Sequence, residues 1–376
     1  VESDTEGFST GVEEKKLGMK GSSTVALSFQ NAKIPIENIL SKPGTGTEIA
    51  FNSLDMGRFK LGCSCLGGSK KVIDEVADYA QNRQAFGTTI SSFDAIIKKI
   101  AEMTIRTFAV DSMIYRTIGS IQSEIDLLKK DDDNYFPKMI KAMEKFAIET
   151  SMVKVFASDT SHWVIDEGLQ IFGGYGFLEE YPLAPAYRDD RINQIWEGTN
   201  EINRTIIVGF FMKKALTEEI PIHNAIADID SFFNKENADS FKGPLRDESL
   251  TIEIAKKVFL YIFNEALCCF GQDLQHEQQI TELLANIMMD IYNVESTIVR
   301  ANKIFKNNKN SKAIEIAKVI SSDMVDQIEV SSRKIAFSIQ QHGPSNISFK
   351  KLKKMVEQMR LNTDTIQLKR EIANYV

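Results

Sequence analysis

Hydrophobic residues recur at helical spacing along most of this chain, and only its first segment shows the alternation typical of a strand. Val25, Leu27 and Phe29 alternate with smaller residues, a pattern that predicts one buried and one wetter face. Pro35 makes a central strand unfavourable just beyond this run. Residues 1–45 therefore predict a fragment of sheet that is too small to close on itself.

From residue 47 onward the apolar positions recur every three or four residues, which predicts amphipathic helices. Ser92 is placed to cap one helix, Pro137 suits the first turn of another, and Thr199 or Asn200 caps a further one. The four predicted helices run over about 47–80, 92–118, 137–172 and 199–215. Because each has one apolar face, we expect an antiparallel four-helix bundle over residues 46–215.

The helical pattern breaks near residue 217, and residues 216–248 indicate a linker with short pieces of helix. Further amphipathic helices then predict an additional helical domain over residues 249–376. Its expected helices cover about 249–270, 276–306, 311–340 and 348–374. The predicted fold class is mostly α: a remnant of sheet, a four-helix bundle and a second helical module.

Composition limits the possible partners. A chain of 376 residues with 43% hydrophobic and 26% charged residues is long enough for two or three domains. The net charge is −7 and basic residues are interleaved with acidic ones, which argues against nucleic acid as a partner. No apolar run is long enough to cross a bilayer, and the best candidate, 258–270, predicts a buried helix. The first residues do not resemble a signal peptide, and the missing initiator Met suggests a trimmed fragment.

The cysteines carry no recognisable site. They lie at positions 63, 65, 268 and 269, without the spacing of a zinc site or a disulfide framework. We therefore expect four buried thiols in a reducing compartment. No metal site is predicted.

Residues 170–200 combine glycine-rich backbone, two arginines and one candidate base, Glu197. Removing a proton next to a thioester carbonyl needs a carboxylate held against the substrate, with water excluded to raise its basicity. Glu197 lies at a junction between helices, where its side chain can enter a cavity. On local sequence alone, a solvated glutamate in a loop is the more common alternative.

The other candidate groups also have ordinary alternatives. Glycines at 173–176 let backbone amides approach phosphate oxygens closely, but they also suit a turn after a helix. Arg83 with Phe86 offers a cation for phosphate and an aromatic edge for a ring, or simply ends a helix. Asp55 and Arg58, three residues apart on one helix, form an ion pair in the plainest interpretation.

Together and in this order, five motifs resemble the flavin-dependent acyl-CoA dehydrogenase family. They are Lys16-Leu17-Gly18-Met19-Lys20-Gly21-Ser22, Pro35-Ile36-Glu37-Asn38, Arg83-Gln84-Ala85-Phe86-Gly87, Gln170-Ile171-Phe172-Gly173-Gly174-Tyr175-Gly176 and Ile195-Trp196-Glu197-Gly198-Thr199-Asn200. The resemblance covers about residues 1–215 and its motifs are highly specific. The helices after residue 216 resemble, mainly in their pattern, the added C-terminal module of the very-long-chain branch and its bacterial relatives.

The resemblance implies an oxidoreductase that converts fatty acyl-CoA thioesters, of long chain in this branch, to trans-2-enoyl-CoA. Glu197 matches the base that removes the α-hydrogen as a proton, while the β-hydrogen leaves as hydride to flavin N5. Some branches place the base at the position matching Gly57 instead, where a glycine cannot serve. Asp55 and Arg58 match residues that contact the CoA thioester, and Gly198 lies beside its acyl end.

The resemblance also implies a set of FAD contacts. Arg83 and Phe86 match a pair that reaches the FAD of a neighbouring subunit, which implies a homodimer or a larger assembly. The backbone that receives the adenosine-diphosphate part matches Gln170, Ile171, Phe172, Gly173 and Gly174. Thr199 and Glu201 match positions near the cofactor in the subunit that carries the base.

Two features depart from the family pattern. Phe93 and Asp94 stand where many members carry a polar pair near FAD, which leaves that contact open. The N-terminal helical domain and most of the β-domain that holds the flavin ring have no counterpart, since residues 1–45 match only the last part of that β-domain. We therefore expect the parent protein to be the enzyme, and this chain alone to bind FAD poorly or not at all.

Partners and alternatives follow from the same resemblance. Electron-transferring flavoprotein is the implied acceptor, and an acyl-CoA oxidase that passes electrons to oxygen is the alternative of the same fold. A non-catalytic helical scaffold or assembly subunit is the alternative from another class. A basic run over residues 350–355 predicts either weak contact with a membrane surface or a solvated helix face. The expected location is the cytoplasm of a bacterium, or the mitochondrial matrix in a eukaryote.

Overall fold

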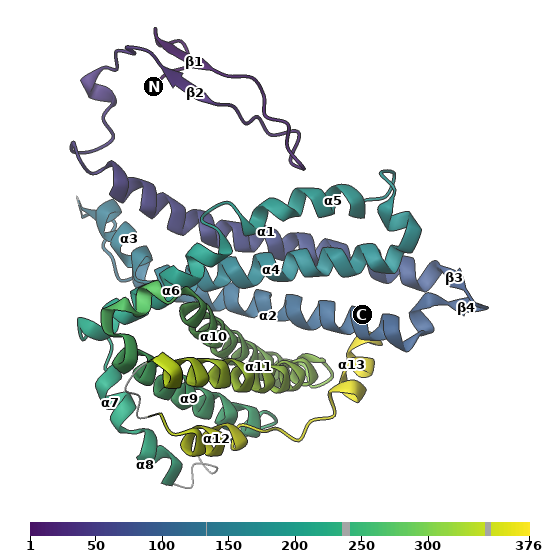
Figure 1. Cartoon of the computed structure of the whole chain (residues 1–376). Helices are drawn as coiled ribbons and strands as arrows, with labels where there is room; N and C mark the ends of the chain where they lie inside the picture. Colours follow the sequence, from purple (N-terminus) through teal and green to yellow (C-terminus); the bar gives the residue numbers. More distant parts are fainter. Residues whose placement is uncertain (133, 235–240, 343–346) are drawn as a thin grey trace.

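The computed structural model describes residues 1–132, 134–234, 241–342 and 347–376. Figure 1 shows two helical modules that lie side by side, with the N-terminal segment running along the outside of the first. This mostly helical architecture, with very little sheet, confirms the predicted fold class.

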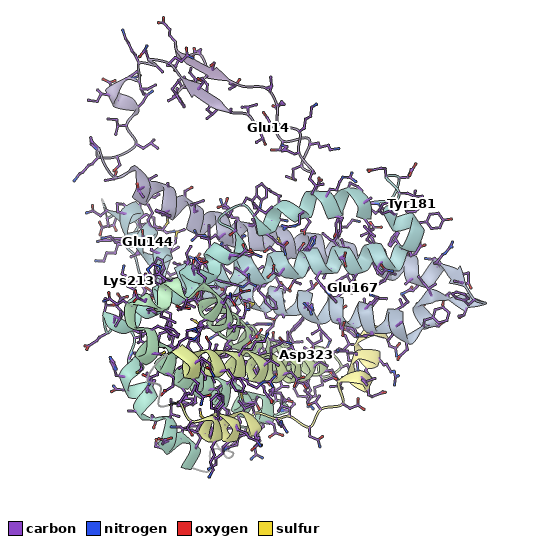
Figure 2. All side chains as sticks on the ribbon, viewed as in Figure 1. Glu14, Glu144, Glu167, Tyr181, Lys213 and Asp323 are labelled. Atoms are coloured by element: carbon purple, nitrogen blue, oxygen red, sulfur yellow. The ribbon has the colours of Figure 1, made fainter. Side chains whose placement is uncertain are left out.

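The N-terminal segment contains one small antiparallel sheet, made of β1 (Phe8–Thr10) and β2 (Leu27–Phe29). The prediction of a buried strand face is wrong, because Leu27 is 59% exposed and Phe29 is 55% exposed. The two strands stand apart from the helices, and side chains such as that of Glu14 project from an open loop (Figure 2). Alternation of side chains gives a buried face only where a second layer covers the sheet.

The first module consists of α1 (Gly46–Asn82), α2 (Asp94–Ile125), α3 (Tyr135–Glu144), α4 (Ala147–Phe172), α5 (Leu183–Asp190) and α6 (Asn200–Leu216). The turn η1 (Ile36–Asn38) precedes α1. The helices are connected by the hairpin of β3 (Gln84–Ala85) and β4 (Thr88–Thr89) and by the turns η2 (Ile90–Ser92), η3 (Gly173–Phe177) and η4 (Arg191–Gln194). The predicted third helix is interrupted between α3 and α4. There the Lys145 carbonyl leaves the helical pattern and accepts a hydrogen bond of 2.9 Å from Lys214 of α6. Ser92 does not cap α2, because Phe93 occupies the cap position.

The second module consists of α9 (Arg246–Phe270), η6 (Gly271–His276), α10 (Gln278–Asn307), α11 (Ala313–His342), α12 (Phe349–Glu357) and α13 (Thr365–Ala373). The helix predicted from residue 348 to residue 374 is therefore two helices. Asp364 separates them, since its side chain accepts a hydrogen bond from the Gln367 N–H and starts α13. In the predicted linker, α7 (Ile222–Ala227) and α8 (Ile229–Asn234) are short helices anchored by buried isoleucines.

Buried contacts join the two modules into one body. A hydrophobic core runs continuously from α1, α2 and α4 into α9, α10 and α11. Charged groups also cross the interface, since Arg300 of α10 binds Asp111 of α2 at 2.8 Å and Arg116 of α2 binds Glu295 of α10 at 2.7 Å. At the other end, Arg370 of α13 forms a two-point ion pair with Asp94. The second module is thus packed against the bundle along the length of α2.

The cysteines differ from expectation. Cys65 is buried, but Cys63 and Cys268 are exposed and Cys269 is half-buried, so the prediction of four buried thiols is wrong. Each cysteine lies on a helix, where neighbouring residues point in different directions. A cysteine next to a buried position can therefore be exposed to solvent. Among the described helices, none is both long and apolar enough to span a bilayer. The described residues also include no His, Cys, Asp and Glu cluster suited to a metal ion.

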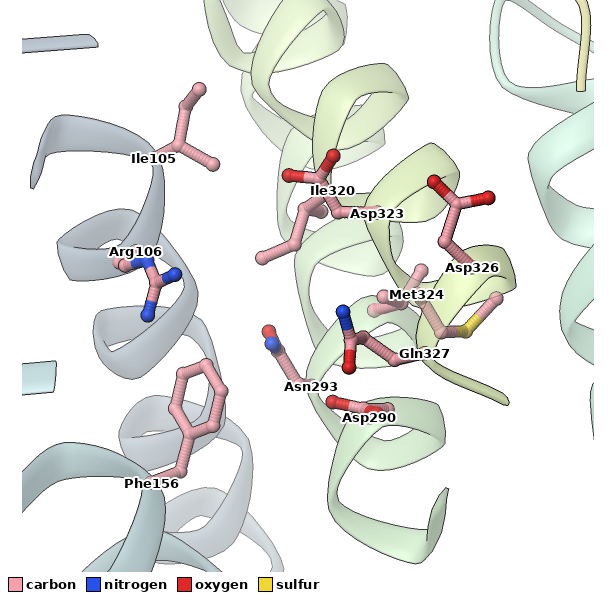
Figure 3. Close-up of a pocket in the computed structure, with 11 residues that line it drawn as sticks. Ile105, Arg106, Phe156, Asp290, Asn293, Ile320, Asp323, Met324, Asp326 and Gln327 are labelled. Atoms are coloured by element: carbon pink, nitrogen blue, oxygen red, sulfur yellow. The ribbon is translucent and has the colours of Figure 1, made fainter. Parts of the chain in front are cut away.

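A charged cavity of about 430 Å³ lies between the modules. Figure 3 shows Arg106 of α2 and Phe156 of α4 on one wall, facing Asp290 and Asn293 of α10 and Asp323 of α11. Burial raises the pKa of Asp290 from 3.8 to about 7, although the Arg106 guanidinium opposes the shift.

The raised pKa of Asp290 predicts a pH dependence of folding. Between its ordinary value of 3.8 and about 7, the folded state keeps a proton that the unfolded state has lost. The free energy of unfolding therefore falls as pH rises through this window. In urea unfolding we expect Asp290→Asn to exceed the wild type in stability by up to about 4 kcal/mol at pH 8, from roughly three pH units at about 1.4 kcal/mol each, with no difference near pH 4. Asp326→Asn, at an exposed position of the same cavity, is the control, and a more stable wild type at pH 8 would contradict the prediction.

Candidate active site

The candidate base lies in a tight loop between η4 and α6. Glu197 has a φ of +57° and Gly198 a φ of +80°, so two consecutive residues adopt left-handed backbone conformations. This region is uncommon for a residue with a side chain and costs about 1–3 kcal/mol when the surroundings enforce it. The conformation of Glu197 therefore has to be held by its neighbours.

The Glu197 carboxylate is turned toward α1 and lies directly over Gly57. A β-carbon added at Gly57 would be 2.3 Å from Glu197 Oε2 and 2.8 Å from Oε1. The residue as a whole is half-buried, and its Oε2 is buried without a hydrogen-bond partner among the described residues. An unpaired, desolvated carboxylate oxygen is unfavourable in a folded protein unless it serves a ligand or a proton transfer.

Side-chain hydrogen bonds hold the carbonyl groups of this loop, including one of 3.4 Å from Asn203 Nδ2 to the Glu197 carbonyl. Arg58 Nε donates to the Glu197 carbonyl at 3.2 Å, and Lys154 Nζ donates to the Gly198 carbonyl at 2.8 Å. The Asn203 amide donates to the same Gly198 carbonyl at 2.8 Å and to the Thr199 carbonyl at 3.1 Å. The backbone around Glu197 is thus fixed from α1, α4 and α6 at once.

Lys154 was not recognised from the sequence, although it is among the largest fully buried side chains described. Burial lowers its pKa to about 8, so at neutral pH the ammonium group is still mostly protonated and donates hydrogen bonds. A sequence signal does exist, because Ser151, Lys154, Ser158 and Ser161 follow one another at spacings of three and four residues. Such spacing marks one face of a helix, and here that polar face is buried against the loop.

The predicted substrate contacts lie around the same loop. Arg58 is only 4% exposed and faces the Glu197 carbonyl. A β-carbon at Gly198 would approach Asn203 Nδ2 at 3.2 Å, which favours glycine there. Asp55 lies one turn before Arg58 on α1, but its side chain falls outside the described part of the structure.

Thr199 and Glu201 lie at the N-terminus of α6. The Thr199 hydroxyl caps this helix by accepting a hydrogen bond of 3.3 Å from the Ile202 N–H, as the sequence predicted. Hydrogen bonds from its own backbone N–H and from the Thr199 hydroxyl hold the pKa of Glu201 below its ordinary value. Both groups therefore sit in the first turn after the base, where a negative charge is stabilised.

The predicted adenosine-diphosphate contacts gather at the shared end of α1 and α4. Arg83, Gly173 and Gly174 line a cavity of about 370 Å³ there, together with Tyr79, Ile90, Ile171, Phe172, Tyr175 and Leu178. A β-carbon at either Gly173 or Gly174 would meet nothing within 4 Å, so their backbone is open to an approaching group. The Arg83 guanidinium lies over the Tyr175 ring at 5.2 Å. A guanidinium beside open backbone suits a phosphate.

The residues of the Gln170 motif differ in how far their side chains are exposed to solvent. Gln170 is exposed, whereas Ile171 and Phe172 are buried and 6% exposed each. The Phe172 ring stacks on Tyr79 at 4.0 Å, which joins the end of α4 to α1. Only the backbone of these two residues is thus available to a ligand.

Phe86 lies at the tip of the β3–β4 hairpin. Phe86 and Gly87 have φ values of +54° and +83°, as a two-residue hairpin turn requires. Its ring is 96% exposed and touches Phe93 edge to face at 6.1 Å. Asp94, next in the chain, is bound to Arg370. A large apolar side chain this exposed suits contact with another molecule.

Comparisons with known proteins agree along the chain. A family model described as "Acyl-CoA dehydrogenase, C-terminal domain" matches residues 44–210, and a second with the same description matches residues 254–354. A probable acyl-CoA dehydrogenase of Bacillus subtilis is 36% identical over 377 residues, covering 99% of this chain and 63% of that protein. An acyl-CoA dehydrogenase complexed with FAD, from Bacillus anthracis, has a TM-score of 0.91 and 34% identity, covering 100% of this chain and 64% of that one.

Acyl-CoA oxidase 1 of Yarrowia lipolytica shares the fold alone, at 16% identity and a TM-score of 0.70, over 98% of this chain and 57% of that one. The chain spans less than two thirds of the length of each of these relatives. Both helical modules nevertheless match models of a single family, and the matching relatives extend over nearly the whole chain. The chain belongs to the acyl-CoA dehydrogenase family.

Proposed function

We propose that the protein carrying this chain is an FAD-dependent dehydrogenase that converts acyl-CoA thioesters to trans-2-enoyl-CoA, with Glu197 as the base. The observation that carries this proposal is the buried, unpartnered Oε2 of Glu197 over Gly57. An oxygen in this state can accept a proton without first giving up another hydrogen bond. FAD, when bound, supplies the acceptor for the hydride that leaves the β-carbon.

The remaining residues keep this base in place. Arg58, Lys154 and Asn203 donate hydrogen bonds to the loop carbonyls, which keeps the Glu197 carboxylate at a fixed distance from α1. Gly57 leaves room for it, and Gly198 permits the left-handed turn that follows. We propose that the acyl thioester lies against this surface, with Asp55, Arg58 and Gly198 beside it.

Two chains share each FAD in our proposal. Gly57 and Tyr79 are 22 residues apart on α1, so the base and the Arg83 cavity are separated by about 33 Å along the helix. This exceeds the distance between the flavin ring and the pyrophosphate of one FAD. The residues that would hold the diphosphate part of the FAD next to Glu197 are therefore Arg83, Gln170 and Gly174 of another subunit, and the exposed Phe86 of that subunit would contact the same FAD.

The finer points of the proposal rest on family resemblance. An apolar cavity of about 480 Å³ between α1 and α3, lined by Ile49, Met56 and Ile140 among others, supports a long acyl chain. Electron-transferring flavoprotein is the proposed acceptor, and steady formation of peroxide would favour an oxidase instead. The Bacillus relatives support a bacterial protein, for which we propose the cytoplasm as the location.

Membrane contact has limited support. Leu352 and Met355 of α12 are 4% and 2% exposed, so the apolar residues of the basic run are part of the core. Lys351 is paired with Asp230 at 2.6 Å. Lys353 lies 3.8 Å from Glu357. Any contact with anionic lipid would therefore depend mainly on Lys350 and Lys354.

Replacing the base tests the proposal directly. In the protein that joins this chain to the N-terminal region of its relatives, we expect Glu197→Gln to lower kcat at least about 1000-fold, because proton abstraction is lost. Flavin absorbance should be retained but should no longer bleach with a saturated long-chain acyl-CoA under anaerobic conditions. Glu218→Gln is a matched control, since Glu218 is also a glutamate with a φ of +57° but is exposed. Turnover that survives in Glu197→Gln would refute the assignment.

The space above Gly57 gives a second test. Gly57→Ala places a methyl group 2.3 Å from Glu197 Oε2, so the carboxylate must move and we expect kcat to fall about 100-fold. Gly67→Ala is the control on the same helix, because a β-carbon there meets nothing within 4 Å. It should keep full activity and gain up to about 1 kcal/mol of stability. Equal activity of both variants would contradict the proposed position of the base.

The exposed ring at residue 86 tests the shared cofactor site. We expect Phe86→Ser to release FAD on gel filtration and to lower the flavin-to-protein ratio at least about twofold, because the ring makes few contacts within its own chain. Phe136→Ser is the control, since Phe136 is 70% exposed on α3, away from the hairpin. A flavin content equal to that of the control would exclude Phe86 from the cofactor site.

A further inference from the structure

One carboxylate, that of Asp159 on α4, accepts hydrogen bonds from both ends of the loop that carries Glu197. Its Oδ1 accepts a hydrogen bond of 2.8 Å from Gln194 Nε2 and one of 2.7 Å from Asn200 Nδ2. Gln194 lies three residues before Glu197 and Asn200 three residues after it. Asp159 therefore links the two ends of the loop directly, while Lys154 and Ser158 also hold Asn200.

Asp159 is itself held through the second module. Its Oδ2 accepts a hydrogen bond of 3.1 Å from Arg204 Nη2 of α6, and Arg204 Nε donates to Asn286 Oδ1 of α10 at 2.8 Å. The Arg204 side chain is only 16% exposed. A guanidinium group is planar and rigid. The hydrogen bond from Arg204 Nε to Asn286 therefore also fixes the direction in which Nη2 donates to Asp159.

We propose that Asn286 is a positioning residue for the base, through which the second helical module sets the geometry of the Glu197 loop. The path runs from Asn286 through Arg204 and Asp159 to both ends of the loop. The proposal concerns the loop itself, and it rests on the proposed function only in taking Glu197 as the base.

The loop needs this support because its backbone is strained. Glu197 in a left-handed conformation relaxes unless the structure around it over-determines its position. Without the Asn286 acceptor, the Arg204 guanidinium can rotate. Asp159 then cannot keep its hydrogen bond to Arg204 and its bonds to Gln194 and Asn200 in one fixed position. Bonds from Arg58, Lys154 and Asn203 remain, so the base should be misplaced for part of the time while the loop stays folded.

Three variants separate this role from general stability. Asn286→Leu removes the acceptor at similar volume, whereas Asn286→Asp retains an oxygen for Arg204. Tyr292→Phe is the matched control, because it removes another hydrogen bond between the same modules, from Tyr292 of α10 to Thr117 of α2 at 2.8 Å.

Hydrogen exchange of this chain reads out the loop directly. The Ile195 and Trp196 amides both donate to the Ile192 carbonyl, at 2.8 and 3.0 Å, and so report on its geometry. We expect Asn286→Leu to accelerate their exchange at least about fivefold, with Asn286→Asp and Tyr292→Phe close to the wild type. Unchanged exchange in Asn286→Leu, or equal acceleration in Tyr292→Phe, would overturn the proposal.

Kinetics of the FAD-loaded longer protein provide the second readout. Asn286→Leu should lower kcat about tenfold with little change in KM, and Asn286→Asp should restore it. Faster exchange with unchanged kcat would also overturn the positioning role. Failure of the proposed function is distinguishable, because it would appear as activity in Glu197→Gln, whatever the exchange results.

Discussion

The structure around the candidate site depends on one contact, the seating of the Glu197 carboxylate against the bare backbone of Gly57. A glutamate with a φ of +57° is unfavourable in itself. Its carboxylate oxygen Oε2 is in addition buried without a hydrogen-bond partner among the described residues. Both features cost free energy, and hydrogen bonds from α1, α4 and α6 to the loop carbonyls offset that cost. Strain concentrated at one functional group is typical of an active site.

Much of the helical architecture could be predicted from the sequence. Long apolar stripes identified α1, α2, α4 and α9 to α11, because each of these helices buries one face along most of its length. The errors lie where distant contacts decide the local structure. The predicted third helix is interrupted at Phe146, which has a ψ of +21°, and the adjacent Lys145 carbonyl accepts a hydrogen bond from Lys214. Leu27 and Phe29 stay exposed because their small sheet stands apart from the helices. Neither effect can be seen in a local pattern.

The candidate site was only partly accessible from the sequence. Glu197, Arg83 and the Gln170 motif were identified by resemblance to a family, and the structure gives each a distinct setting. Lys154 and Asp159 were missed. The spacing of Ser151, Lys154 and Ser158 marks a polar helix face, but it does not identify the partner of Lys154, which lies 44 residues away. Their role emerges only when α4 is packed against the loop, which is a property of the tertiary structure.

The two helical modules form one mechanical unit. Their shared core and the polar contacts between α2 and α10 leave little freedom for one module to move against the other. Asn286 of α10 also binds Arg204, the contact through which we propose that the second module positions the Glu197 loop. The additional helices are therefore more than a peripheral extension of the bundle.

The central claim is that Glu197 faces the α-carbon of a bound thioester from its position above Gly57. The most direct measurement is a crystal structure of the complete protein with FAD and a non-reactive acyl-CoA analogue. Our account predicts a Glu197 carboxylate oxygen within about 3 Å of the α-carbon position, with the flavin ring on the opposite side of the acyl chain. A Glu197 side chain turned out into solvent in that complex, with the thioester bound elsewhere, would contradict the account.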